Sequence, residues 1–256
     1  MYEKYICHSV WGPSIYEPRD PSRHDQSWDN FVTPPLLRSL KVPLHDAKTE
    51  EVHWLVHEPA YVSRWGSDIG GQKTAPTQYQ HAINVKKRFS SYLDLLKKRA
   101  AERSWKYQGI SSAEDVLAHL KGLKASRISG VWFYGHARDD LWLSLRHDSR
   151  DHEAIEPDSK DVLSLSRIGT LKASSFVPHN TAKAPHKFFG CNTKPFAANW
   201  AKLLGVYAEG AEGKVDFARI HHNGGMVVLS AGAKWFQYSN AGFPFPLGIK
   251  AGEPVG

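Results

Sequence analysis

The chain has 256 residues and a formal net charge of +7, from 33 Lys and Arg against 26 Asp and Glu. Its hydrophobic and charged fractions, 41% and 23%, are those of an ordinary globular protein and exclude wholesale disorder. Two cysteines exclude a disulfide framework and a four-cysteine zinc site, and no apolar run is long enough for a membrane helix.

The first 50 residues read as an arm ahead of the main domain. They hold six of the 15 prolines, and Pro34-Pro35 disfavours both a helix and a central strand. We therefore predict an irregular, proline-rich N-terminal arm over 1–50 and a single domain over 51–256. Residues 11–50 of the arm are a candidate binding segment for a protein partner. The N-terminus has no basic start followed by an apolar stretch, so we expect a cytoplasmic protein, or one exported without a classical signal peptide.

Hydrophobic periodicity predicts the elements that come next. Alternating apolar residues predict a strand over 51–57, and a glycine-rich loop is expected over 66–77. Apolar residues at spacings of three and four then predict one helix over about 78–105. Ser111 followed by Glu114 fits a capping box for a second helix.

Two strongly apolar strands follow, and each ends at a chemically interesting residue. The first is expected over 128–134, ahead of Gly135-His136, and the second over 187–190, ahead of Cys191. Thr193 is placed to cap the next helix, and Gly205 to stop it. The other predicted elements are a strand over 141–145, a charged loop over 146–160, a short helix or turn over 161–171, and strands over 206–208, 214–220, 226–230 and 234–238.

Strands that alternate with helices predict an α/β domain with a mostly parallel central sheet, followed by a C-terminal β-hairpin region. In such sheets the reactive groups lie beyond the carboxyl ends of the strands. His136 and Cys191 both follow strands directly, and they would emerge at one edge if those strands are neighbours. A thiol beside an imidazole is the arrangement that nucleophilic catalysis needs.

The residues around this pair are consistent with a reactive thiol. Cys191 precedes a helix, whose positive dipole end favours a thiolate, and Lys194 adds a positive charge. The backbone N–H groups of Cys191 and Ala137 are candidates for an oxyanion hole. Gly135 and Gly190 lack side chains, which lets a substrate backbone approach closely.

The order of a strand with Gly135-His136, about 50 residues, and a strand with Gly190-Cys191 resembles the caspase-like (clan CD) cysteine peptidases. The stretches GVWFYGHA (130–137) and FFGCNT (188–193) carry this resemblance, which extends over roughly 110–240. The likeness is closest to bacterial CHAT-type domains and to the caspase-like domains of polymorphic toxins.

The resemblance implies a caspase-like three-layer sandwich and an endopeptidase that cleaves protein or peptide substrates, as a bacterial effector or toxin component. In that mechanism Cys191 attacks a peptide carbonyl and His136 delivers a proton to the leaving amine, with no metal or other cofactor. No third residue that orients the imidazole can be chosen from the sequence.

Four further residues are expected at or near the substrate. Gly135, Gly190 and Asn192 lie next to the proposed dyad in the sequence. Glu209 follows the strand after the Cys191 helix, and it would either line a pocket for a basic side chain or be an ordinary strand residue.

Two alternatives to a peptidase remain open. The first is a catalytically inactive caspase-like module that binds a protein. It remains open because the chain departs from the family pattern at Ala137 and Lys194, where relatives often carry glycine. The second is a protein that binds nucleic acid, anionic lipid or an acidic partner, because residues 86–106 hold eight Lys and Arg against two acidic residues. The plainer interpretation of that segment is the solvated face of an amphipathic helix.

Three other groups of histidine and cysteine have plainer explanations. His53 and His57 have the spacing of metal ligands but lack the HExxH motif. His221-His222 adjoins an Asn-Gly-Gly turn, and Cys7-His8 lies near the terminus without a strand–turn–helix context. We expect all three to be structural.

Overall fold

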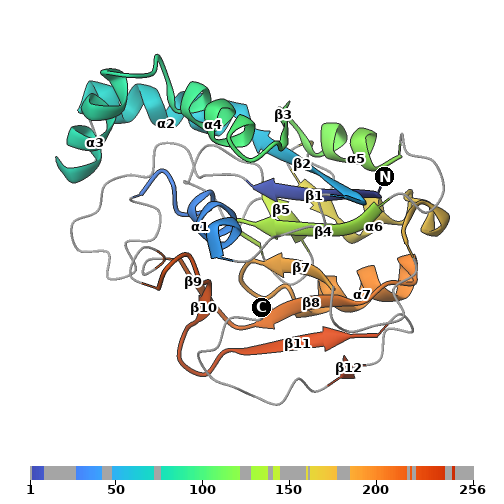
Figure 1. Ribbon diagram of the computed structural model, residues 1–256. Helices are drawn as coiled ribbons and strands as arrows, with labels where there is room; N and C mark the ends of the chain where they lie inside the picture. The colour runs from blue at the N-terminus through green and yellow to red at the C-terminus, as the bar shows by residue number, and fades with distance from the viewer. Residues whose placement is uncertain are drawn as a thin grey trace.

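The computed structural model describes residues 2–8, 27–41, 48–71, 76–121, 128–137, 141–144, 160, 162–177, 185–217, 220, 223–239 and 244–245. In these ranges an eight-stranded sheet crosses the molecule in the order β12-β11-β8-β7-β4-β1-β2-β3 (Figure 1). Its strands are β1 (Tyr2–His8), β2 (Glu50–His57), β3 (Lys106–Ile110), β4 (Ile128–Tyr134), β7 (His186–Phe189), β8 (Ala208–Glu212), β11 (Lys234–Tyr238) and β12 (Pro244–Phe245).

The sheet is mostly parallel, as the alternation of strands and helices predicted. All neighbouring strands from β3 to β8 run parallel, whereas β11 is antiparallel to β8 and β12 is antiparallel to β11. The chain starts in the middle of the sheet, adds β2 and β3 on one side of β1, and then adds β4, β7 and β8 on the other. The two strands that precede His136 and Cys191, β4 and β7, are therefore direct neighbours.

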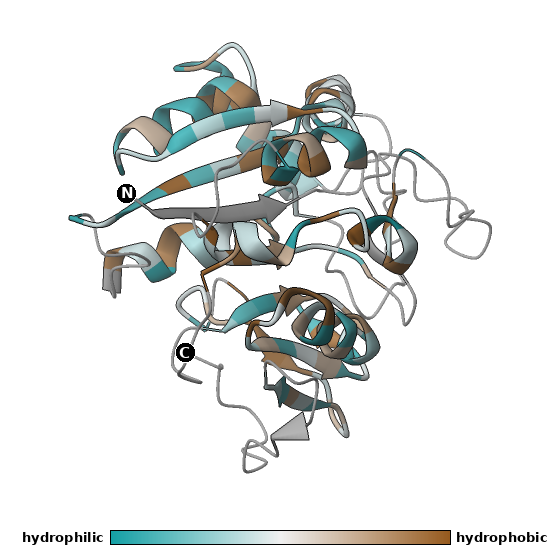
Figure 2. Cartoon of the chain, turned by 90° about the vertical axis from the view of Figure 1, so that its right-hand side faces the viewer, coloured by the Kyte–Doolittle hydropathy of each residue, from teal (hydrophilic) through white to brown (hydrophobic). Residues whose placement is uncertain are grey.

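Helices cover both faces of the sheet. They are α1 (Thr33–Lys41), α2 (Glu58–Gly70), α3 (Pro76–Lys86), α4 (Tyr92–Ala101), α5 (Ala113–Lys121), α6 (Leu165–Ile168), α7 (Lys194–Leu204) and the short η2 (Ala173–Ser175). In Figure 2 these helices carry brown and teal bands, the amphipathic pattern of helices that bury one side. Within the described ranges, no helix is long and apolar enough to cross a membrane.

Two separate hydrophobic clusters show that each face has its own core. Successive side chains of a strand point to opposite faces, so Trp132 and Tyr134 of β4 pack in one cluster and Val131 and Phe133 in the other. The first cluster contains buried residues of α2, α3 and α4, and the second contains those of α5, α6 and α7. The sheet is thus the middle of three layers.

The prediction of an irregular arm over 1–50 was wrong in two places. Residues 2–8 form β1, which pairs with both β2 and β4 near the centre of the sheet. Residues 33–41 form α1, because its two prolines fall in the first turn, where a helix does not need their N–H groups. Most of the remaining arm, over 9–26 and 42–47, lies outside the described residues.

The region over 58–105 contains more elements than predicted. The first part of the expected loop over 66–77 belongs to α2, which extends to Gly70. Pro59 lies in the first turn of α2, and the end of this helix is set by Gly71 in a left-handed conformation at φ 64°. The single helix predicted over 78–105 is broken into α3 and α4, because the Ser91 hydroxyl accepts the N–H of Asp94 at 3.1 Å and starts a new helix.

Two other boundaries differ by small shifts. The capping box of α5 is formed by Ser112 and Asp115, one residue later than predicted, since each side chain accepts the backbone N–H of the other, at 3.1 and 3.3 Å. The strand expected over 206–208 begins at Ala208.

The smaller strands complete the fold. The segment predicted as a helix or turn over 161–171 begins with β6 (Val162–Ser164), which pairs antiparallel with β5 (Leu141–Ser144) before α6 starts. The C-terminal hairpin region contains β9 (Val215–Asp216) and β10 (Val228–Leu229), also antiparallel. Apart from Lys160, the charged loop predicted over 146–160 lies outside the described residues.

Candidate active site

The register between β4 and β7 brings the two candidate catalytic residues to one edge. Residues Trp132 to Tyr134 pair in order with residues Lys187 to Phe189. The last pair of this ladder, Tyr134 and Phe189, is closed by the N–H of Gly135, which donates to the carbonyl of Phe189 at 3.3 Å. His136 and Cys191 each lie two residues beyond this last pair, at the carboxyl ends of the two neighbouring parallel strands.

Backbone contacts show how closely the two strand ends approach. A Cβ atom on Gly190 would lie 2.7 Å from the Cβ of Ala137 and 2.9 Å from the carbonyl oxygen of Gly135. A Cβ atom essentially never comes within 3 Å of another non-bonded heavy atom, so position 190 accommodates glycine unless the neighbouring backbone shifts. The structure therefore brings together Gly135, Ala137 and Gly190, three of the residues that the sequence placed at the site.

Cys191 is a partly buried cysteine at the start of a tight turn. Its Sγ accepts the backbone N–H of Val215 at 3.5 Å. The next residue, Asn192, adopts a left-handed conformation with φ 55°. It makes two hydrogen bonds with Gly213, each 2.9 Å long: the Asn192 side-chain oxygen accepts the Gly213 N–H, and the Asn192 N–H donates to the Gly213 carbonyl. These bonds fix the cysteine turn against the segment that follows β8.

Thr193 has a larger role than the cap that the sequence predicted. It precedes α7, but its hydroxyl makes no capping bond to the helix. The buried hydroxyl instead contacts the carbonyls of Phe188 and Gly190 at 2.8 and 3.1 Å and accepts the N–H of Ala211 at 3.0 Å. Thr193 thereby ties the end of β7 and the cysteine turn to β8.

His136 is held by aromatic rings from distant parts of the chain. The buried ring of Phe31 meets the imidazole edge-on, with centroids 5.2 Å apart and planes at 81°. Phe31 in turn packs edge-on against Phe217 at 4.7 Å. Nothing in the local sequence signals this contact, because Phe31 lies just ahead of the proline pair of the supposed arm.

Glu209 lies inside the sheet rather than at its edge. It is 3% exposed, and Lys187 of β7 and Gln237 of β11 stand opposite it in register. The Lys187 Nζ is 3.8 Å from one carboxylate oxygen, and the Gln237 amide donates to the other at 3.3 Å. These partners favour the interpretation of Glu209 as an ordinary strand residue over a role in a substrate pocket.

The environment of Glu209 predicts a pH-dependent stability. Burial raises the pKa of Glu209 to about 7, against the attraction of Lys187 and Arg38. The folded chain then binds the proton more tightly than the unfolded chain, so this group lowers stability as the pH rises from about 4.5 to about 7.

Replacing Glu209 by glutamine should remove that dependence. In urea unfolding, the free energy of unfolding of the wild type should fall by about 2 kcal/mol between pH 5 and pH 7.5 relative to that of Glu209→Gln, since one pKa unit corresponds to about 1.4 kcal/mol. Parallel stability profiles for the two proteins would show that Glu209 titrates normally.

The other sequence candidates have identifiable surroundings. The basic side chains of segment 86–106 are largely exposed on α3 and α4, with Lys97 over the ring of Tyr107 and Lys98 over that of Phe89. His53 and His57 lie in β2, where their Nε2 atoms contact Glu51 and the carbonyl of Ser111. No group of three metal-ligating side chains occurs among the residues the structure describes.

Cys7-His8 has more context than the sequence suggested. It ends β1, and it pairs with Phe133 and Tyr134 of β4, so it belongs to the same edge of the sheet as Gly135-His136. His221-His222 lies outside the described residues.

Comparison with known proteins adds no relative. No family model, curated protein or solved structure matches this chain. The residues at the carboxyl edge of β4 and β7 are therefore the basis for assigning a function.

Proposed function

We propose that the chain is a caspase-like cysteine endopeptidase in which Cys191 is the nucleophile and His136 the general acid and base. The observation that carries this proposal is the direct parallel pairing of β4 and β7, because His136 and Cys191 each follow two residues after the last pair of that ladder. Reactive groups of α/β sheets lie beyond such carboxyl ends, which supports a thiol and an imidazole acting together here. A bacterial effector or toxin component is the biological setting that the resemblance implies.

The surroundings of the sulfur support a reactive thiolate. Cys191 lies three residues ahead of α7, an 11-residue helix whose N-terminal end carries partial positive charge. The Val215 N–H that donates to Sγ favours the charged form of the sulfur. Lys194 adds less than the sequence suggested, because its ammonium pairs with Glu212 and lies 4.2 Å from the ring centre of Phe236.

The chemistry follows from these placements. The Cys191 thiolate attacks the carbonyl carbon of the peptide bond, and the oxyanion is received by the N–H groups of Cys191 and Ala137. The C–N bond then breaks, and protonated His136 gives its proton to the leaving amine. Water attacks the thioester, His136 takes a proton from it, and the carboxylic product leaves with the thiolate restored.

Labelling with peptide acyloxymethyl ketones tests the proposal. Mass spectrometry of the wild-type chain should locate the adduct on Cys191, and His136→Ala should slow labelling at least 100-fold, because acid–base assistance contributes about that much. Cys191→Ala should abolish labelling, while the matched variant Cys7→Ala should keep it.

Two results would count against a peptidase. Undiminished labelling or cleavage by Cys191→Ala would remove this residue from the reaction. A folded wild-type chain that neither reacts with the electrophiles nor cleaves peptides would favour the inactive, partner-binding module.

A further inference from the structure

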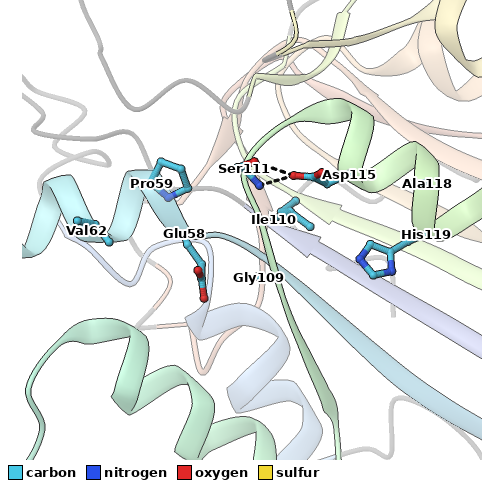
Figure 3. A pocket seen from close by; sticks show the side chains of 9 residues that line it. All are labelled: Glu58, Pro59, Val62, Gly109, Ile110, Ser111, Asp115, Ala118 and His119. Carbon is cyan, nitrogen blue, oxygen red and sulfur yellow. Dashed lines mark hydrogen bonds between the residues drawn. The ribbon is translucent and has the colours of Figure 1, made fainter.

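A cavity of about 690 Å³ opens at the carboxyl ends of β2 and β3 (Figure 3). It exists because the helices that follow these two neighbouring strands diverge: α2 packs on one face of the sheet and α5 on the other. Such a crevice outside the ends of parallel strands is where α/β proteins commonly bind ligands. The lining residues are Glu58, Pro59, Val62, Gly109, Ile110, Ser111, Asp115, Ala118 and His119.

The lining combines apolar walls with negative charge. Pro59, Val62, Ile110 and Ala118 supply hydrocarbon, and Val62 is 58% exposed although it is apolar. Two carboxylates line the cavity, and among the residues that the structure describes no lysine or arginine does. Burial lowers the pKa of His119, so its imidazole is neutral near pH 7 and does not offset these charges.

The charge of the cavity excludes an anionic ligand. The start of a helix attracts anions, and both α2 and α5 start here. Asp115, however, already accepts the N–H groups of Ser111 and Ser112 at 2.7 and 3.1 Å, and these bonds lower its pKa. The chain's own carboxylate thus occupies the anion position, and Glu58 adds a second negative charge.

Glu58 is held where it can meet a ligand. Its Oε1 accepts the Tyr107 hydroxyl at 3.0 Å and lies 3.7 Å from the half-exposed Lys97 ammonium. A Cβ atom on Gly109 would lie 2.5 Å from the Glu58 carboxyl carbon, so the glycine makes room for this carboxylate over the end of β3. Both contacts within the described part of the chain use Oε1, which leaves Oε2 to receive a donor.

We propose that this cavity binds the arginine or lysine side chain of a peptide substrate, with Glu58 as the partner of the cationic group. The apolar walls suit the methylene groups of such a side chain, and a carboxylate suits its charged end. This inference rests on the proposed peptidase function, since it assigns a substrate class to the same sheet edge.

The sheet order sets the distance between the cavity and the proposed dyad. The cavity lies between the ends of β2 and β3, and the dyad between the ends of β4 and β7, with β1 in the middle. Three strand spacings of about 4.8 Å give about 14 Å, which an extended peptide covers in about four residues. The favoured substrate therefore carries a basic residue about four positions from the bond that is cut.

A binding experiment tests the cavity without catalysis. N-acetyl-arginine amide and its neutral isostere N-acetyl-citrulline amide are titrated into the full-length Cys191→Ala chain and followed by NMR at the amides of Gly109 and Ile110. We expect at least ten-fold tighter binding of the arginine compound. Equal binding of the two compounds would overturn the proposal. This comparison uses two ligands on one protein, so it does not depend on the folding of a cavity variant.

Matched variants identify the partner of the cation. Glu58→Gln should remove the preference for arginine, and Glu114→Gln should keep it, because Glu114 belongs to α5 but lies outside the cavity and is 61% exposed. An undiminished preference in Glu58→Gln would overturn the assignment of Glu58.

A labelling experiment separates the two proposals. Peptide electrophiles with arginine or citrulline about four positions from the reactive group are applied to the wild-type chain, and we expect at least ten-fold faster labelling of Cys191 with arginine. Equal rates for the two peptides would overturn the basic-residue site and keep the peptidase. Arginine-selective binding by a chain whose Cys191 never reacts would overturn the peptidase, and with it a substrate role for the cavity.

Discussion

Replacing Gly190 by alanine should destabilise the chain by about 2–3 kcal/mol and lower the reactivity of Cys191 at least 100-fold. The added methyl group would lie 2.7 Å from the Cβ of Ala137 and 2.9 Å from a backbone oxygen of Gly135. No side-chain rotation relieves a clash with backbone, so the ends of β4 and β7 must move apart. Urea unfolding and the rate of electrophile labelling measure the two effects.

Gly66→Ala is the matched control for this substitution. Gly66 lies inside α2, and a Cβ atom there meets nothing within 4 Å. Alanine should therefore stabilise the helix by about 0.5–1 kcal/mol and leave the thiol unchanged. Wild-type stability and reactivity in Gly190→Ala would mean that the two strand ends are farther apart than described.

Replacing Asp68 by alanine should cost about 3–5 kcal/mol, because it removes the carboxylate from a buried ion pair. Asp68 and Arg64 are both almost fully buried in α2, 2.9 Å apart. The same carboxylate oxygen also accepts the Tyr92 hydroxyl of α4 at 2.8 Å. The substitution therefore weakens both the ion pair and the attachment of α4 to α2.

An exposed ion pair provides the control for Asp68. Arg99 and Glu102 are 2.8 Å apart, but their side chains are 47% and 37% exposed. Glu102→Ala should change the unfolding free energy by less than about 1 kcal/mol, since water screens such pairs. Equal effects of Asp68→Ala and Glu102→Ala in urea unfolding would show that burial does not set the strength of the α2 pair.

The sequence predicted the strands that form the proposed site. β4 has seven buried residues in a row and β7 has four, and the apolar residues Val131 to Tyr134 and Phe188-Phe189, each run followed by glycine, mark these buried parallel strands. The helix after Cys191 also ends where predicted, because Gly205 takes the left-handed conformation that stops a helix.

The sequence could not predict what the N-terminal residues do. Tyr2–His8 alternates polar and apolar residues weakly, yet β1 is hydrogen-bonded on both sides because β2 and β4 flank it. A proline pair predicts the absence of a helix, except where the prolines lie in the first turn, as they do in α1. The sequence alone does not show where that first turn begins.

Contacts between distant segments were equally hidden. Phe31 packs on His136 across 105 positions of sequence, and the Thr193 hydroxyl reaches Ala211 on the neighbouring strand. Local pattern cannot reveal such pairs, since they depend on the order of strands in the sheet. The same holds for the cavity between α2 and α5, because hydrophobic periodicity predicts neither α2 nor β3.

The pH dependence of Cys191 alkylation tests the central claim most directly. Iodoacetamide modification of the peptide that contains Cys191 is followed by mass spectrometry between pH 5 and pH 9, in the wild type and in His136→Ala. A thiolate stabilised by the imidazole and the helix end predicts a half-maximal rate below about pH 7, moving toward about pH 8.5 in the variant. A midpoint near pH 8.5 in both proteins would contradict a functional Cys191–His136 pair.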